Sequence, residues 1–168
     1  MTMNEEVALM VRIFLAEDNA ADVWLIEEAL RRKSIHFEID NYTTAAEAIE
    51  AVTRCGLEDA PVPDLILLDY NLPSGHGADI LAAAGQNPYV ARVPKAIVTS
   101  FLQPGEMNHV IELGAACVIT KPAGLEEFMR EVGGQIEALL RGAVCSGDEA
   151  KRPGGTELRL PNEDRKRL

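Results

Sequence analysis

The fold of this chain is decided by one stretch, Asp64-Leu65-Ile66-Leu67-Leu68-Asp69. Its four consecutive aliphatic residues leave no polar face, so the segment is typical of a strand covered on both sides in a parallel sheet. Further apolar runs occur at residues 11–16, 96–99 and 116–120. Residues 37–42 alternate apolar and polar side chains, as a strand near a sheet edge does. The sequence therefore indicates five strands.

Segments with helical periodicity separate these strands. Asn19 can cap a helix over residues 20–32, and Thr44 with Glu47 forms a capping box that opens a second helix ending near residue 54. Three more helical segments follow: one after the loop at 71–77 to about residue 84, one at 105–113 and one at 125–141. Five alternating pairs of strand and helix predict a doubly wound α/β fold, in which helices cover both faces of a parallel sheet.

The length suits one domain with short extensions. The chain has 168 residues, of which 47% are hydrophobic, and this composition excludes a wholly disordered chain. We expect an N-terminal extension at residues 1–9, one domain at residues 10–141 and a disordered polar tail at residues 142–168. The tail is assigned because it carries five acids and six bases without an apolar period.

Charge and cysteine content narrow the functional class. A net charge of −11 argues against a nucleic-acid partner, because it leaves no room for a large basic face. No apolar run is long enough to cross a bilayer, and no secretory signal occurs at the start. The three cysteines lack metal-ligand spacing, so we expect free thiols in a reducing compartment. These features predict a cytoplasmic protein without a membrane partner.

Polar residues collect where the predicted strands end. They are Glu17 and Asp18 after the first strand, Asp69 at the end of the third, Thr99 and Ser100 after the fourth and Lys121 after the fifth. Open parallel sheets bind ligands at this edge. Carboxylates brought so close together need a cation between them, and oxygen ligands suit Mg²⁺. With a lysine and a hydroxyl beside the metal, the set predicts a phosphoryl-transfer site with a carboxylate nucleophile.

Separated motifs in this order resemble the receiver domain of bacterial two-component response regulators. They are Phe14-Leu15-Ala16-Glu17-Asp18-Asn19, Leu67-Leu68-Asp69-Tyr70-Asn71-Leu72-Pro73, Val98-Thr99-Ser100 and Thr120-Lys121-Pro122. The resemblance covers residues 10–141 and implies a flavodoxin-like receiver with the strand order 2-1-3-4-5. It also implies that Asp69 accepts a phosphoryl group from a histidine kinase.

The resemblance further implies the roles of the other site residues. Mg²⁺, or Mn²⁺ in its place, would be held by Glu17, Asp18 and Asp69 together with the backbone carbonyl of Asn71. Thr99 would bind a phosphoryl oxygen.

Lys121 would form an ion pair with the phosphoryl group. The resemblance also leads us to expect a cis peptide bond between Lys121 and Pro122, as a constrained turn that aims the lysine.

One part of the chain resembles a narrower group. Asp18-Asn19-Ala20-Ala21-Asp22, followed by residues 25–30 and a long loop before the third strand, is similar to the stand-alone regulators paired with bacterial and cyanobacterial phytochromes. A phytochrome-like histidine kinase, such as a bacteriophytochrome, is therefore a candidate partner. Trp24 lies off the apolar stripe of its helix and is a candidate anchor for the kinase. Its alternative role is packing against residues 1–10.

The last predicted helix carries an apolar stripe that is wider than one sheet face needs. It consists of Phe128, Met129, Val132, Ile136, Leu139 and Leu140. This width favours a homodimer through the surface of the fourth helix, the fifth strand and the fifth helix, a mode that receiver domains use. Packing in the core is the alternative.

An aspartyl phosphohydrolase is the competing function, because Asp69-Tyr70-Asn71 resembles an Asp-x-Asp nucleophile motif. In the haloacid-dehalogenase-like enzymes that motif comes first, the acidic pair comes last and a cap is inserted. Here the pair Glu17-Asp18 comes first, and no segment is long enough for a cap. We therefore predict a phosphoacceptor signalling protein and not an enzyme, with Mg²⁺-dependent self-dephosphorylation at most.

Overall fold

Five parallel strands form the central sheet of the computed structural model, which describes residues 9–142. In spatial order they are β2 (Phe37–Tyr42), β1 (Val11–Ala16), β3 (Leu65–Leu68), β6 (Lys95–Thr99) and β7 (Cys117–Thr120). Because β6 and β7 are the fourth and fifth strands of this sheet, the predicted order 2-1-3-4-5 is confirmed. The strand bounds agree with the predicted ones to within one residue.

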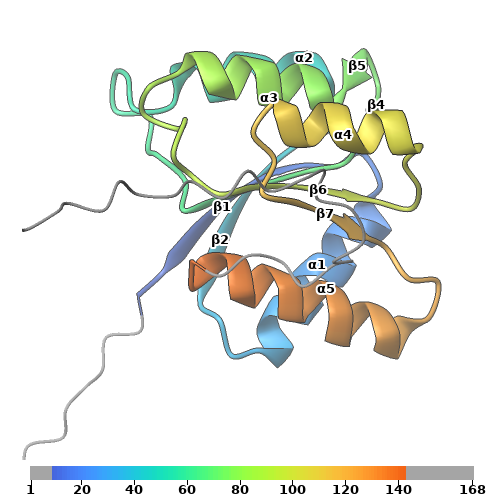
Figure 1. The fold of residues 1–168 in the computed structure, drawn as a ribbon. Coiled ribbons are helices and arrows are strands. Elements are labelled where there is room, and N and C mark those ends of the chain that lie inside the picture. Colours follow the sequence, from blue (N-terminus) through green and yellow to red (C-terminus); the bar gives the residue numbers. More distant parts are fainter. Residues whose placement is uncertain (1–8, 143–168) are drawn as a thin grey trace, which may run out of the picture.

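Helices cover both faces of the sheet (Figure 1). One face carries α1 (Ala20–Arg32) and α5 (Leu125–Leu140), and the other carries α2 (Ala45–Arg54), α3 (Gly77–Gln86) and α4 (Pro104–Glu112). Alternate residues of β3 feed the two cores: Leu65 and Leu67 pack with α1 and α5, whereas Ile66 and Leu68 pack with α2 and α3. This two-sided burial explains why β3 consists of aliphatic residues alone.

The apolar stripe of α5 lies inside the domain. Phe128, Val132, Ile136 and Leu139 are at most 2% exposed and belong to the core that α1 and α5 form on the sheet, and Met129 is 4% exposed. Core packing, the alternative reading of the stripe, therefore accounts for its width. The stripe itself gives no support to a dimer surface.

A short hairpin occupies the predicted loop after Asp69. Its strands are β4 (Asn71–Leu72) and β5 (Gly75–His76), paired antiparallel. The N–H of Ala45 donates to the carbonyl oxygen of Pro73 at 3.0 Å, and the N–H of Ala46 donates to Ser74 Oγ at 3.3 Å. The hairpin thus satisfies free N–H groups at the start of α2, which fixes the loop beside Asp69.

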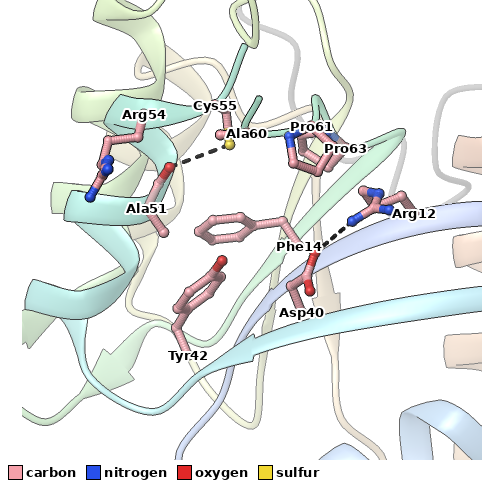
Figure 2. Close-up of a pocket in the computed structure, with 10 residues that line it drawn as sticks. All are labelled: Arg12, Phe14, Asp40, Tyr42, Ala51, Arg54, Cys55, Ala60, Pro61 and Pro63. Carbon is pink, nitrogen blue, oxygen red and sulfur yellow. Dashed lines mark hydrogen bonds and ion pairs between the residues drawn. The ribbon is translucent and has the colours of Figure 1, made fainter. Parts of the chain in front are cut away.

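The cysteines differ from the expectation of three free thiols. Cys55 is free, and its buried thiol donates to the carbonyl oxygen of Ala51 at 3.4 Å (Figure 2). Burial, with the nearby Asp40 carboxylate, raises the pKa of this thiol. Cys117 is disulfide-bonded, so the prediction is wrong there. Cys145 lies outside the described residues. Sequence spacing failed because it does not show which cysteines meet in space.

Cys55 also lines a cavity of about 240 Å³ between α2 and the strands β1 and β2 (Figure 2). The rings of Phe14 and Tyr42 pack there with their centroids 4.6 Å apart. None of the residues predicted to bind metal or phosphate lines this cavity. The predicted chemistry must therefore be sought elsewhere in the described chain.

The described chain begins and ends at the same end of the sheet, by the amino ends of the strands. The first strand, β1, starts at the edge where α5 ends (Figure 1), because the helices run back antiparallel to the strands. The predicted extensions at residues 1–9 and 142–168 lie almost wholly outside the described residues. No helix within residues 9–142 is long and apolar enough to cross a membrane.

Gly77 packs directly against Asp69, the residue that follows β3. A Cβ atom there would lie 2.5 Å from the carbonyl oxygen of Asp69 and 3.1 Å from Ile97 Cδ1. We predict that Gly77→Ala lowers the free energy of unfolding by about 1–3 kcal/mol, because the start of α3 must move away from the sheet. Urea unfolding of the purified protein measures this loss.

The matched control is Gly85→Ala in the same helix, since no heavy atom lies within 4 Å of a Cβ at that position. This substitution should raise the free energy of unfolding by about 0.5–1 kcal/mol, because alanine is the better helix former. Equal effects of the two substitutions would contradict the close packing at Gly77.

Candidate functional site

Three carboxylates converge at the carboxyl ends of β1 and β3. One oxygen atom from each of Glu17, Asp18 and Asp69 lies within 4.8 Å of the other two. The N–H of Asp69 donates to the carbonyl oxygen of Ala16 at 2.8 Å, which keeps the two strand ends level. Glu17 is 1% exposed. The structure thus brings together the three carboxylates that the sequence predicted as one group.

Lys121 follows β7 and reaches into this group. Its Nζ lies 2.6 Å from Glu17 Oε2, 2.8 Å from Asp22 Oδ2 and 3.2 Å from Asp69 Oδ2. Burial alone would lower the pKa of Lys121, but the hydrogen bonds to Asp22 and Glu17 and the negative charges outweigh it, so the pKa is raised. The side chain is therefore a charged ammonium, and each of its N–H groups has a carboxylate acceptor.

The site keeps an excess of negative charge. Burial raises the pKa of Glu17, and its effect exceeds the opposing effects of the hydrogen bonds from Lys121 and from the N–H of Asn19. The carboxylates of Glu17, Asp22 and Asp69 share the single ammonium of Lys121, and the carboxylate of Asp18 lies beside those of Glu17 and Asp69. Closely spaced hard oxygen donors with uncompensated charge are the ligands that Mg²⁺ and Mn²⁺ prefer. The residues present therefore fit a divalent cation.

A cavity of about 360 Å³ lies over these groups. It is lined by all the residues predicted for metal and phosphate binding, namely Glu17, Asp18, Asp69, Asn71, Thr99 and Lys121. Thr99 ends β6 and is 4% exposed, and its carbonyl oxygen accepts a hydrogen bond from the N–H of Lys121 at 2.9 Å. The ends of the neighbouring strands β6 and β7 thereby place a hydroxyl and an ammonium in the lining of the same cavity as the carboxylates.

The peptide bond between Lys121 and Pro122 is trans, since none of the described peptide bonds is cis. The expectation of a cis bond is therefore wrong. The lysine is aimed by its backbone bond to Thr99 and by the three carboxylates, and the structure shows no need for a constrained turn.

Asp22 is a residue of the site that the sequence pattern did not indicate. This residue lies in the first turn of α1, four residues after Asp18, and Asn19 Oδ1 caps that turn by accepting from the N–H of Ala21 at 2.9 Å. Residues four apart lie on one side of a helical turn, so this spacing was the available signal. It did not reveal that Lys121, 99 positions later, would bind there.

The family and the relatives that this chain matches agree with the function that the site residues predict. Residues 13–133 match the family of the response regulator receiver domain. The chain is 33% identical over 123 residues to Response regulator Rcp1 of Synechocystis sp., covering 73% of this chain and 84% of Rcp1.

Two solved structures are also similar. The phosphorylated cyanobacterial phytochrome response regulator RcpA matches with a TM-score of 0.72 at 33% identity, covering 83% of this chain and 100% of RcpA. The Mn²⁺-bound form of Rcp1 matches with a TM-score of 0.68 at 33% identity, covering 76% of this chain and 92% of Rcp1. With a family match over most of its length and these relatives, the chain belongs to the response regulator receiver family of two-component signalling.

Proposed function

We propose that Asp69 is the phosphoacceptor of this response regulator and that a histidine kinase is the donor. The observation that carries the proposal is that the Asp69 carboxylate lies close both to the acidic pair Glu17 and Asp18 and to the ammonium of Lys121. A carboxylate oxygen of Asp69 would attack the phosphorus of a phosphohistidine. The new O–P bond forms as the P–N bond breaks, and the imidazole leaves with a proton.

The three carboxylates of the site would hold Mg²⁺, or Mn²⁺ in its place, together with the carbonyl oxygen of Asn71. When bound, the ion would supply positive charge that offsets the charges of the carboxylates and of the phosphoryl oxygens. The Mn²⁺-bound structure of the homologue Rcp1 supports this assignment.

Two further residues would bind the phosphoryl group. Lys121 is charged and already 3.2 Å from Asp69, so its ammonium would form an ion pair with a phosphoryl oxygen. The hydroxyl of Thr99 would donate a hydrogen bond to another oxygen. Hydrolysis of the resulting acyl phosphate, a slow Mg²⁺-dependent self-dephosphorylation, is the only reaction that we assign to the protein alone.

We predict that a small acyl phosphate in the presence of Mg²⁺ adds one phosphoryl group to the wild-type protein. Asp69→Asn should take up none, because the amide oxygen is a poor nucleophile, and removal of Mg²⁺ by a chelator should also abolish uptake. Intact-protein mass spectrometry measures the added group. Asp59→Asn, in the exposed loop before β3, is the charge-matched control and should behave as wild type. Uptake by Asp69→Asn at the wild-type rate would contradict the proposal.

We propose that the kinase docks on α1 and contacts Trp24. This side chain is 53% exposed and lies on the helix whose first turn borders the site. An exposed tryptophan is the type of side chain that most often dominates binding energy at interfaces. RcpA is a phytochrome response regulator, and this likeness makes a phytochrome-type histidine kinase the leading partner.

Trp24→Ala should slow phosphotransfer from the cognate kinase by about tenfold or more, the size expected for an interface anchor. Phosphorylation by the small donor should not change, because Trp24 is absent from the residues that line the cavity. Tyr89→Ala removes another exposed aromatic, 54% accessible and remote from α1 in sequence, and serves as control. An unchanged kinase reaction in Trp24→Ala would exclude Trp24 as the anchor.

We also propose a homodimer through α4, β7 and α5. Exposed apolar side chains on this surface, and not the buried stripe of α5, support the proposal. They are Met107 and Ile111 of α4 and Leu125 at the start of α5, whose exposed fractions are 37%, 45% and 49%. Such side chains are commonly covered by a partner surface.

Ile111→Glu should shift the protein towards monomer, because it places a charge in the proposed interface. Light scattering at high protein concentration, with and without beryllofluoride as a phosphoryl analogue, measures the mass. Leu57→Glu changes a similarly exposed residue, 46% accessible, in the loop after α2 and is the control. A wild-type protein that stays monomeric in both conditions would rule out the dimer.

The net charge of the chain bears on whether nucleic acids or membranes are partners. A net charge of −11 disfavours binding to nucleic acids and to anionic membranes, which are themselves negative. We therefore propose that the signal is passed on through protein contacts. We also propose that the protein works in the cytoplasm, a location that the match to the receiver family supports.

A further inference from the structure

We propose that Asp22 is a positioning residue for phosphorylation. Its carboxylate holds the ammonium of Lys121 in place while one N–H of that ammonium passes from Asp69 to the phosphoryl group. The inference rests on the proposed role of Asp69 as phosphoacceptor. Its starting point is that the three N–H groups of Lys121 meet three carboxylates, those of Glu17, Asp22 and Asp69. Two of these three carboxylates have other assigned roles, and Asp22 has none.

The bond to Asp22 is short and shielded. Asp22 Oδ2 lies 2.8 Å from Lys121 Nζ, nearer than Asp69 Oδ2 at 3.2 Å. The lysine side chain is 7% exposed and that of Asp22 is 23% exposed. A charge-assisted hydrogen bond this far from water is worth more than a surface ion pair, which contributes little.

Helix α1 holds Asp22 outside the metal group. The Asn19 cap defines where α1 starts, and Asp22 lies in its first turn, where the helix dipole stabilises a negative charge. Asp22 does not belong to the group of three carboxylates whose oxygens lie within 4.8 Å of one another. Its position therefore depends on the helix and on Lys121.

The other two acceptors of Lys121, Glu17 and Asp69, also have proposed roles in metal binding and phosphorylation. Glu17 is a proposed metal ligand, so its bond to Lys121 competes with that role. Asp69 becomes an acyl phosphate, in which its carboxylate loses its charge and phosphoryl oxygens take over as acceptors. Asp22 alone keeps the same atoms and the same charge before and after phosphorylation. It can therefore anchor the ammonium while one N–H passes from Asp69 to the phosphoryl group.

The first test needs neither metal nor phosphate. It measures how fast an amine-acylating reagent modifies Lys121, by peptide mass spectrometry, with Lys33 as internal reference because its side chain is 34% exposed. Asp22→Ala should raise the reactivity of Lys121 about tenfold, the factor that one charge-assisted hydrogen bond is worth. Asp22→Asn keeps an acceptor oxygen and should lie between Asp22→Ala and wild type.

The control is Glu28→Gln, which removes the same charge from the same helix but from a side chain that contacts Arg31 and Arg32. It should leave the reactivity of Lys121 unchanged. Urea unfolding of each variant shows that the fold is intact. Wild-type reactivity of Lys121 in Asp22→Ala would overturn the proposal.

The second test measures the phosphorylation rate with the small acyl phosphate over a series of Mg²⁺ concentrations. Asp22→Ala should be about tenfold slower than wild type, with Asp22→Asn between them, because the hydrogen bond positions the lysine. If Asp22→Asn and Asp22→Ala were equally slow and both recovered at higher Mg²⁺, Asp22 would contribute charge alone and the positioning role would be wrong.

The two tests separate this inference from the proposed function. A wild-type protein that is not phosphorylated on Asp69 would refute the proposed function, and the reactivity of Lys121 would still decide whether Asp22 holds the lysine.

Discussion

Crowded negative charge at one sheet edge is the constraint on which this structure depends. Parallel strands all end on the same side, so the acidic residues that follow β1 and β3 cannot avoid one another. Lys121 relieves part of the repulsion by giving each of its N–H groups to a different carboxylate. The burial of Glu17 makes that relief necessary, since an unpaired charge in its place would be costly. The remaining negative charge is what makes the edge receptive to a metal ion.

The strands and helices could be predicted almost to the residue because local signals agree with the fold. The aliphatic run of β3 admits only a doubly covered strand, and the side chains of Asn19 and Thr44 mark the starts of α1 and α2 as observed caps. The hairpin β4–β5 escaped prediction because strands of two residues have no periodicity to detect. It is held by the N–H groups at the start of α2, which are distant in sequence.

The site residues that lie at the carboxyl ends of strands could be predicted from the sequence. Glu17, Asp18, Asp69, Thr99 and Lys121 all lie at such ends, and a parallel sheet brings them together without further information. Asp22 was not predictable, because its role depends on the direction of a lysine side chain. The isomer of the Lys121–Pro122 bond and the bonding of Cys117 are likewise three-dimensional facts. The α5 stripe was ambiguous, since width alone does not tell a core from an interface.

The return of the described chain to one side of the sheet has a practical consequence. β1 begins and α5 ends by the amino ends of the strands (Figure 1), whereas the carboxylates of Glu17, Asp18 and Asp69 and the side chain of Lys121 follow the carboxyl ends of β1, β3 and β7. A reporter domain fused at either point, or a linker to a biosensor chip, would therefore begin on the far side of the sheet from Asp69. The orientation of an immobilised protein would leave the acidic edge facing the solution, where a large protein can approach it.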